Sequence, residues 1–309
     1  MKTLLYTHES CLRHDTGPGH PESPDRLRAI LERLKRPDFT ALEWREAPEA
    51  SLAQIERVHD PDYVRAVLAR IPRNGHAALD GDTIVSPGSR EAALRAAGAA
   101  CAAVDAVLTR EAGRAFCAVR PPGHHAEPDQ AMGFCLFNNV AVAAAHAREH
   151  YHLDRVAVID FDVHHGNGTE AMLQGRRGYF YASSHQHPLY PGTGSGSLPG
   201  VDNVVNVPLG SMTDSTEFRE RFRETVLPAV RAFGPQLLMI SAGFDAHASD
   251  PLAGLNLEAD DFEWATLELV TIAERFANGA VVSTLEGGYD LPALAACAAA
   301  HVRALMAGD

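Results

Sequence analysis

The sequence predicts an α/β protein built on one mostly parallel β-sheet with helices on both faces. Short apolar or β-branched runs alternate along the chain with longer Ala- and Leu-rich segments at helical spacing. This alternation is typical of parallel strands that are joined by helices and buried on both faces. No internal repeat and no Ser/Gly/Pro-rich linker divides the 309 residues, so we expect a single domain, 1–309, with a large core.

The individual elements follow from these two patterns. The apolar runs predict the core strands Thr3–Tyr6, Phe116–Val119, Val156–Asp160, Tyr179–Ser183, Leu237–Ser241 and Val281–Leu285. A further short strand is possible at Asn203–Val207. The helical spacing predicts the long helices Ser89–Thr109, Asn138–Glu149, Glu217–Phe233, Ala259–Phe276 and Leu291–Met306. The first of these helices is rich in Ala, but its larger apolar residues share one face, which favours a packed helix over a low-complexity segment.

The composition restricts the partners and the compartment. The formal net charge of -13 disfavours a broad contact with nucleic acid and favours cationic partners such as amines or basic peptides. The cysteines are odd in number and scattered without a CxxC spacing, so we expect neither a disulfide framework nor a thiolate zinc site. Because the chain lacks both a signal-peptide pattern and a run of about 18 apolar residues, we expect a soluble cytoplasmic protein that makes no membrane contact.

Polar side chains follow four of the predicted strands at their carboxyl ends. The segments RPPGHHAE, DFDVHHGNGTE, AGFDAHASDP and EGGYD each come directly after an apolar run. The carboxyl ends of parallel strands lie on one edge of a sheet, where ligand crevices form. We therefore expect one site to contain His124, His125, Asp162, His164, Asp245 and Tyr289.

The carboxylates in this set indicate a cation. Asp160, Asp162 and His164 alternate along the chain, so an extended backbone turns all three toward one side. A single Asp at a strand end is as often a hydrogen-bonded loop residue as a ligand. With Asp245 added, however, three carboxylates would repel one another in one pocket without a cation. Two carboxylates and one imidazole leave coordination positions open, as in catalytic zinc sites, and Fe(II) or Mn(II) suits the same donors.

The neighbouring side chains indicate hydrolysis. Adjacent histidines in a loop are commonly plain polar residues, but His124 and His125 beside a metal-activated water suit a general acid and base. Tyr289 follows two glycines, and at this edge its hydroxyl can donate to a developing oxyanion rather than only pack in the core. Phe134 and Tyr190 lie in Gly-containing loops, where they either pack locally or wall a narrow apolar tunnel. Together these residues predict metal-assisted hydrolysis of an amide or a similar carbonyl.

Several motifs, in this order and over most of the chain, resemble a known family. RPPGHHAE, GFCLFNN, DFDVHHGNGT, SAGFDAHASDPL and EGGYD closely resemble the zinc-dependent histone deacetylase family, in particular its class II branch and prokaryotic relatives, and HDTGPGHPESPDRL resembles its first active-site loop. The resemblance implies the arginase/deacetylase fold and one zinc ion per chain. It implies the zinc ligands Asp162, His164 and Asp245, the catalytic pair His124 and His125, the carbonyl polariser Tyr289, the tunnel walls Phe134 and Tyr190, the amide acceptor Gly133 and the inner-channel residue Arg26.

The resemblance also implies partners for the two histidines. Asp160 is expected to pair with His124 and Asn167 with His125, so that His124 stays charged while a neutral His125 moves the proton. Class I members carry Asp where this chain has Asn167. A structural potassium ion is implied near the zinc, held by Asp160, Asp162, His164, Ser183 and Ser184.

The implied activity is removal of an acetyl or related acyl group from a lysine side chain of a peptide or protein. An acetylpolyamine amidohydrolase is the alternative, but its eukaryotic relative carries a gatekeeping Glu where this chain has Leu252, and a PEACE-like insert that this chain lacks. Glu22 and Asp82 lie in loops where they can still supply an acidic mouth. A non-catalytic acyl-lysine binder is disfavoured because no ligand is lost, and the GHH and GGY motifs do not fit a manganese ureohydrolase.

Two features remain without an assigned function. His165 is expected to have a structural role only. The GTGSGS run after Pro191 lacks the GK[ST] sequence of a phosphate-binding loop, so we do not expect it to bind phosphate. The sequence leaves the physiological substrate, the acyl length and the oligomeric state open.

Overall fold

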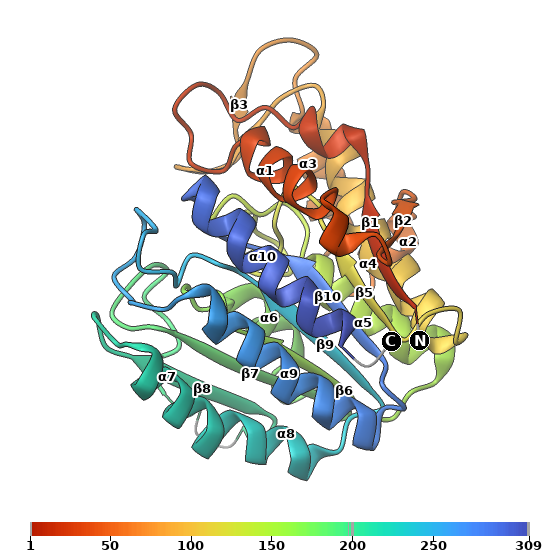
Figure 1. The fold of residues 1–309 in the computed structure, drawn as a ribbon. Helices are drawn as coiled ribbons and strands as arrows, with labels where there is room; N and C mark the ends of the chain where they lie inside the picture. Colours follow the sequence, from red (N-terminus) through yellow and green to blue (C-terminus); the bar gives the residue numbers. More distant parts are fainter. Residues whose placement is uncertain (1, 197, 199–200, 308–309) are drawn as a thin grey trace.

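The centre of the molecule is a parallel β-sheet. The computed structural model describes residues 2–196, 198 and 201–307, so the predicted domain ends and Ser197 of the GTGSGS run lie outside the described residues. Within these residues the main sheet has eight strands in the order β2-β1-β5-β10-β9-β6-β7-β8, and every pairing is parallel, which confirms the predicted architecture (Figure 1). The strands are β1 (Thr3–Thr7), β2 (Glu43–Glu46), β5 (Arg114–Cys117), β6 (Val156–Asp160), β7 (Tyr179–Gln186), β8 (Val204–Leu209), β9 (Leu237–Ala242) and β10 (Val281–Leu285).

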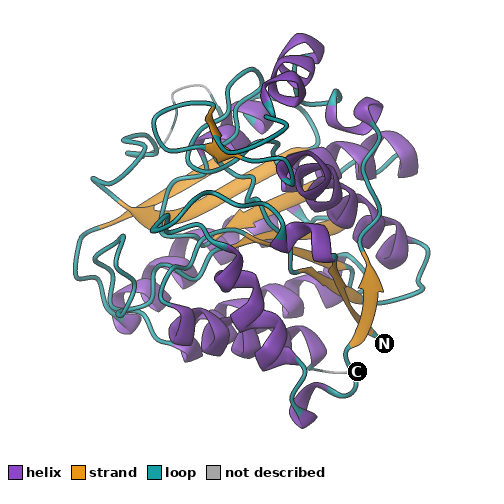
Figure 2. Ribbon diagram, turned by 90° about the horizontal axis from the view of Figure 1, so that it is seen from above, coloured by secondary structure: helices purple, strands orange, loops and turns teal. Residues whose placement is uncertain are grey.

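Helices cover both faces of this sheet, as the apolar strands require (Figure 2). One face is covered by α4 (Ser89–Leu108), α5 (Asn139–Tyr151) and α6 (Asn167–Leu173). The other face is covered by α1 (Pro24–Leu34), α8 (Leu227–Phe233), α9 (Ala259–Phe276) and α10 (Leu291–Met306). The remaining α-helices are α2 (Leu52–Ile55), α3 (Pro61–Arg70) and α7 (Ser215–Arg221).

The strand predicted at Phe116–Val119 lies two residues earlier in the structure, at Arg114–Cys117. A buried arginine at a strand start is tolerated here because its guanidinium donates to the Leu305 carbonyl (2.8 Å) and to the Glu274 carboxylate (2.8 Å). Both partners come from helices far along the chain. The charged residue therefore concealed the start of the strand in the sequence pattern.

The single helix predicted over Glu217–Phe233 contains a wider turn. Residues Phe222–Val226 form a π-helical turn between α7 and α8, and the Leu227 N–H donates to the Phe222 carbonyl five residues earlier. Pro228 gives the physical reason, because its ring lacks an N–H and clashes with the carbonyl four residues before it in a regular α-helix.

The sequence pattern missed several short or polar elements. β2 is an edge strand with the sequence EWRE, and its charges suit an exposed edge but hide the strand period. Helices α1 and α3 were missed although their buried residues recur at helical spacing. Helices α2 and α6 are short, and the hairpin β3 (Ala77–Ala78) and β4 (Ile84–Val85) has two residues in each strand. Elements this small bury too little apolar surface to leave a clear periodic signal.

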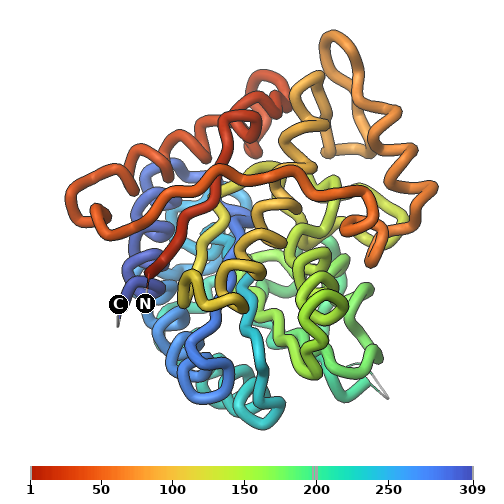
Figure 3. The backbone as a smooth tube through the Cα atoms, turned by 90° about the vertical axis from the view of Figure 1, so that its right-hand side faces the viewer, coloured from red at the N-terminus to blue at the C-terminus, as the bar shows by residue number. Residues whose placement is uncertain are grey.

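The first strand and the last helix lie side by side (Figure 3). The Thr3 hydroxyl donates to the Leu305 carbonyl at 3.3 Å, which joins the start of β1 to the end of α10. All the cysteines are buried free thiols, as their scattered positions predicted. In the described part of the chain, no helix is both long and apolar enough to cross a membrane.

A buried histidine joins α10 to the neighbouring elements. His301 Nδ1 lies 2.7 Å from Thr266 Oγ1 on α9, and Nε2 lies 2.8 Å from Ser283 Oγ on β10. The ring also packs edge-on against Phe116 and Phe161. Burial lowers the pKa of His301 to about 3, so the ring is neutral in the folded protein.

We expect His301→Gln to flatten the acid side of the stability profile. The unfolded chain binds a proton here near pH 6.5, whereas the folded chain does so only near pH 3. The native state therefore has its full stability above pH 6.5 and loses about 1.4 kcal/mol per pH unit as the pH falls between these values. In urea titrations of chelator-treated protein at about pH 7 and pH 5, the wild type should lose about 2 kcal/mol more than the variant. Equal losses would contradict this prediction.

Candidate active site

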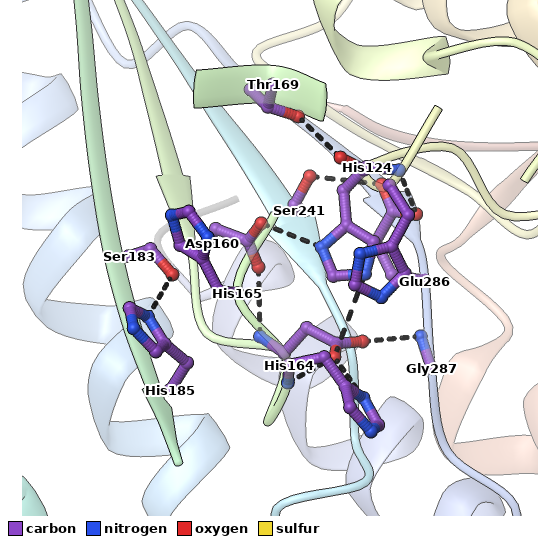
Figure 4. A network of polar contacts seen from close by, with 12 residues as sticks. His124, Asp160, His164, His165, Thr169, Ser183, His185, Ser241, Glu286 and Gly287 are labelled. Carbon is purple, nitrogen blue, oxygen red and sulfur yellow. Dashed lines mark hydrogen bonds and ion pairs between the residues drawn. The ribbon is translucent and has the colours of Figure 1, made fainter. Parts of the chain in front are cut away.

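Five adjacent strands, β5, β10, β9, β6 and β7, end at the same edge of the sheet. The ends of these strands and the segments that follow them carry most of the residues that the sequence predicts for the site. Figure 4 shows three of them, His124, Asp160 and His164, close to Glu286. The structure brings the predicted residues together because parallel strands deliver their carboxyl ends to one place.

Asp162, His164 and Asp245 form a buried cluster that can hold a metal ion. His164 Nδ1 lies 3.1 Å from Oδ1 of Asp162 and 3.1 Å from Oδ2 of Asp245. The three donor atoms all lie within 4.8 Å of one another, and no second such group was found in the part of the chain that the structure describes.

The chemistry of this cluster fits a divalent cation. Carboxylate oxygens only accept hydrogen bonds, so two buried carboxylates that face one imidazole nitrogen require a proton or a metal ion between them. Burial alone would lower the pKa of His164, but Asp162 and Asp245 outweigh it and raise the pKa to about 10. Gly243 and Gly287 pack so closely against the carboxylates that a Cβ at either position would overlap them. The donor set therefore suits the zinc ion that the motifs imply.

The turn after β6 gathers these donors without an extended backbone. β6 ends at Asp160 and residues 162–164 bend, so the extended geometry expected for Asp160 to His164 is wrong beyond the end of the strand. Side-chain contacts set the bend instead, because Asp160 Oδ1 accepts from the Asp162 N–H (3.1 Å) and Asp162 Oδ1 accepts from the His164 N–H (2.8 Å). Phe161 and Val163 are buried in the core, so the alternation of polar and apolar side chains is kept.

His124 and His125 have different partners. His124 Nδ1 lies 2.9 Å from Asp160 Oδ2, whereas His125 Nδ1 lies 2.8 Å from Asn167 Oδ1. Burial alone would lower the pKa of His124, but the neighbouring carboxylates, Asp160 foremost, raise it well above its usual range. At His125 burial and the positive charge of His124 act together and hold the pKa well below its usual range. The surroundings of His124 thus favour its charged form, and those of His125 favour its neutral form.

A cavity of about 240 Å³ reaches the metal cluster. Its walls include every residue that the sequence predicts for substrate contact, together with one wall residue that the sequence reasoning missed, Leu189. The lining residues are Asp82, His125, Gly133, Phe134, His164, Leu189, Tyr190, Leu252 and Tyr289.

The aromatic walls are held in specific positions. The Phe134 ring packs edge-on against Tyr289, with the ring centres 5.9 Å apart, and the Tyr190 ring lies 5.1 Å from the ring of His125. Phe134 has a φ of 68°, a left-handed backbone that bulky residues rarely adopt. The Thr83 hydroxyl accepts from the Phe134 N–H at 3.2 Å, so the loop between β3 and β4 supports this conformation.

The expectation that Glu22 supplies an acidic mouth is wrong. Glu22 is fully buried, and it accepts from Arg120 Nη2 (2.7 Å) and Arg26 Nη1 (3.0 Å). Burial opposes ionisation, but these arginines hold the pKa of Glu22 well below its usual range. Arg26 in turn lies behind the site, with its guanidinium 4.7 Å from the ring centre of Tyr289. Asp82 alone of the two acidic residues lines the cavity.

The residues implied for potassium lie on β6, in the turn that follows it and on β7. Asp160 and Ser183 are opposite each other in the β6–β7 ladder. His185 Nε2 faces the Gly194 carbonyl (2.8 Å), so it carries the hydrogen, and the Nδ1 of the neutral ring accepts from the Ser183 hydroxyl (2.8 Å). Burial lowers the pKa of His185 to about 4, which keeps the ring neutral. The Ser183 lone pairs are thus left for another partner, and the neighbouring Ser184 hydroxyl has no hydrogen-bond partner among the described residues.

Sequence reasoning missed Glu286, which directly follows β10. Its Oε2 accepts from the N–H groups of Gly123 (2.7 Å) and His124 (3.1 Å), and its Oε1 accepts from the Ser241 hydroxyl (3.0 Å) (Figure 4). This carboxylate therefore connects the ends of β5, β9 and β10. An acidic residue between an apolar strand and two glycines was the available signal, because a buried carboxylate needs donors around it.

Asp250 is a second residue that the sequence reasoning did not assign. Its Oδ2 accepts from the Tyr289 N–H at 2.7 Å, and its Oδ1 accepts from the Leu252 N–H at 3.0 Å. Asp250 thereby fixes two walls of the cavity relative to each other. The signal was the Asp-Pro pair in ASDPL, a sequence that favours a turn.

The fold and the site together define an α/β protein with a cluster of two aspartates and one histidine that can hold a metal ion beside a cavity. A family model described as the histone deacetylase domain matches residues 20–305. The chain belongs to the histone deacetylase family.

Individual relatives support the same conclusion. The chain is 45% identical over 301 residues to an uncharacterised protein of Synechocystis sp., with 96% of each chain covered. It is 39% identical over 327 residues to a histone deacetylase-like amidohydrolase of Pseudomonas aeruginosa, with 98% of this chain and 86% of the relative covered. The crystal structure of the HDA15 HD domain matches with a TM-score of 0.93 at 34% identity, with 99% of this chain and 89% of that chain covered. These similarities confirm the family and the fold, and they support hydrolase activity.

Proposed function

We propose that the chain is a zinc-dependent deacylase that removes an acetyl or related acyl group from a lysine side chain. The observation that carries this proposal is one cavity that combines apolar walls, such as Phe134 and Leu252, with a metal-binding cluster that includes His164. An acyl-lysine combines the same features, because an apolar stem ends in an amide. Asp162, His164 and Asp245 would hold the zinc ion.

A zinc ion bound there would supply Lewis-acid chemistry, since it polarises a carbonyl oxygen and lowers the pKa of water. His125 lines the cavity, and its Nδ1–H donates to the Asn167 oxygen, which leaves the lone pair of Nε2 free. His125 Nε2 accepts a proton from the attacking water and transfers it to the leaving amine. The Asn167 amide is itself oriented by a contact of 2.7 Å with the Glu127 carboxylate.

The other residues stabilise charge and position the substrate. His124, bound to Asp160, remains positively charged and favours the negative charge that develops on the acyl oxygen. The Tyr289 hydroxyl donates to the same oxygen. The Gly133 carbonyl accepts from the N–H of the scissile amide. The Arg26 guanidinium supports the Tyr289 ring from behind and borders the inner channel.

A potassium ion is proposed at Asp160, the main-chain carbonyls of Asp162 and His164, the Ser183 hydroxyl and the carbonyl of Ser184. The direction of the Ser183 hydroxyl hydrogen toward His185 supports this placement, because it leaves oxygen lone pairs for a cation. A buried monovalent ion would offset the charge of the Asp160 carboxylate.

Asp82 favours an acetylpolyamine as a second candidate substrate. Its carboxylate lines the cavity, where it can attract an ammonium group. Leu252 lines the same cavity and offers no charge, which favours the neutral stem of a lysine.

Side-by-side turnover of acetyl-lysine peptides and N-acetylputrescine tests the proposal, with zinc measured on the same sample. We expect release of acetate from the peptides, loss of this activity on chelation and recovery with zinc. Tyr289→Phe is the matched control, because it keeps the ring and removes the hydroxyl. A preference of several orders of magnitude for N-acetylputrescine would replace the lysine assignment, and a metal-loaded chain that binds acyl-lysine without releasing acetate would refute a deacylase.

We expect Glu286→Ala to lower kcat about 100-fold while the bound metal is unchanged, because the turn that carries His124 loses its anchor and small displacements of catalytic groups are costly. Glu286→Gln should retain activity within about 10-fold, since one amide oxygen can accept both backbone N–H groups while the amide nitrogen donates to Ser241. The measurement is kcat together with metal content. Wild-type kcat in Glu286→Ala would contradict the role of this carboxylate.

A further inference from the structure

The two sequence features without an assigned function contact each other. His165 is buried in the turn after β6, and its Nδ1 lies 2.7 Å from Thr193 Oγ1 in the glycine-rich run. Its Nε2 lies 3.0 Å from Glu170 Oε2 on α6. Because a carboxylate only accepts, Nε2 carries a hydrogen, and the other ring nitrogen, Nδ1, shares a hydrogen bond with the Thr193 hydroxyl. A buried ring beside the metal turn thus holds an exposed loop residue.

A second buried imidazole holds the next residue of the same loop. His185, on β7, donates from Nε2 to the Gly194 carbonyl at 2.8 Å, while the Ser183 hydroxyl fixes its other nitrogen (Figure 4). The rings of His165 and His185 lie 4.7 Å apart, centre to centre. The two neighbouring rings therefore form hydrogen bonds with consecutive loop residues, Thr193 and Gly194.

Asn206 on β8 adds a further contact with the same loop. Its Nδ2 donates to Glu170 Oε2 at 2.6 Å and to the Gly196 carbonyl at 3.3 Å. We call His165, Glu170, His185 and Asn206 the loop clamp. Gly194 has a φ of 75°, and a Cβ there would lie 2.5 Å from His185 Nε2, so the loop packs against the clamp too closely for a side chain.

The clamped loop begins at the cavity wall. Tyr190 is 39% exposed, and its ring lies 5.1 Å from His125 and 6.3 Å from His164. An aromatic side chain that is this exposed needs support from its backbone to keep a fixed position. The loop clamp supplies this support three to six residues later in the chain.

We propose that the loop clamp positions Tyr190 as the cavity wall that contacts the stem of the acyl-lysine, which makes His165 and His185 positioning residues for substrate binding. This inference rests on the proposed function. It assigns His165, next to the metal ligand His164, to the loop rather than to the metal. It also explains the glycine-rich run as a segment that fits against two imidazoles.

The test compares Thr193→Val with Thr193→Ser. Thr193 is exposed, so neither change should disturb folding, but only Ser keeps the hydroxyl that forms the hydrogen bond with His165. For Thr193→Val we expect faster hydrogen exchange at the backbone amides of residues 192–196 and a KM about 5-fold higher, with kcat within about 2-fold of the wild type. Thr193→Ser should behave as the wild type in both measurements.

Two further variants separate positioning from general stability. Gly194→Ala should reproduce the faster exchange and the higher KM, because the added Cβ displaces the loop from His185. Thr271→Val, on the exposed face of α9, is the matched control and should change neither. Unchanged exchange at residues 192–196 in Thr193→Val, an unchanged KM, or faster exchange throughout the chain with loss of kcat would each overturn the inference. If the wild type hydrolyses no acyl-amine, the proposed function fails together with the substrate role, while exchange still decides whether the clamp holds the loop.

Discussion

Asp162→Asn is expected to abolish metal binding and to lower kcat/KM by at least about 1,000-fold, which corresponds to about 4 kcal/mol of transition-state stabilisation. An amide in place of the Asp162 carboxylate removes one negative charge from the donor cluster, and its nitrogen cannot act as a ligand. The Oδ2 atom also accepts from the Gly287 N–H at 2.8 Å, so the substitution disturbs the orientation of the turn as well. The measurements are the amount of zinc bound per protein chain and the turnover of an acetyl-lysine peptide.

A stability measurement separates metal loss from misfolding. Because a ligand that binds only the native state stabilises it, chelation should lower the melting temperature of the wild type but leave that of Asp162→Asn unchanged. Asp105→Asn is the matched control, since Asp105 contacts His146 at 2.6 Å away from the site, and it should keep both metal and activity. Full zinc content in Asp162→Asn would contradict the assignment of this ligand.

His125→Ala is expected to lower kcat about 1,000-fold or more, and His124→Ala about 100-fold. The difference follows from position, because His125 lines the cavity while His124 lies behind it and contacts Asp160. A proton can be transferred only by a group that reaches the reacting atoms, whereas a fixed charge acts over a longer distance. Metal content should remain unchanged in both variants.

Single-turnover kinetics on both variants provide the measurement, since they isolate the chemical step from product release. A larger loss in His124→Ala than in His125→Ala would exchange the two roles. Asn167→Asp extends the test, because a carboxylate beside His125 would favour its charged form and make it a poorer base at neutral pH. We expect this variant to lose activity on the acid side of its pH profile first.

The parts of the fold that the sequence predicted are those buried on both sides. The strand bounds Val156–Asp160 and Val281–Leu285 and the helix bounds Ala259–Phe276 and Leu291–Met306 agree with the structure. Burial on both faces gives an uninterrupted apolar run, and packing against the sheet gives helical spacing, so each leaves its own signal. The edge strand β2 leaves no such signal, because exposed residues are free to be charged.

The site divides in the same way. Its residues were predictable because ionisable side chains such as Asp162 and His164 follow apolar strands, where burial of an unpaired charge is unfavourable. A shared site accounts for several such side chains at one edge of the sheet. The complete burial of the Glu22 side chain was not predictable, because it depends on the ion pair with Arg120, which is 98 residues away in the sequence. The contacts of Glu286 were equally hidden, since Gly123 and His124 reach it only when β5 and β10 become neighbours.

By itself, the sequence determined the fold class, the edge of the sheet that carries the site, the candidate metal ligands and the family, because each depends on residue type and local spacing. Tertiary structure alone decided which acidic residue faces the cavity, how the turn after β6 bends and which residues His165 contacts. Those properties depend on contacts between segments far apart in the chain, such as the 2.7 Å contact between His165 and Thr193, and no local pattern records which distant atoms will meet.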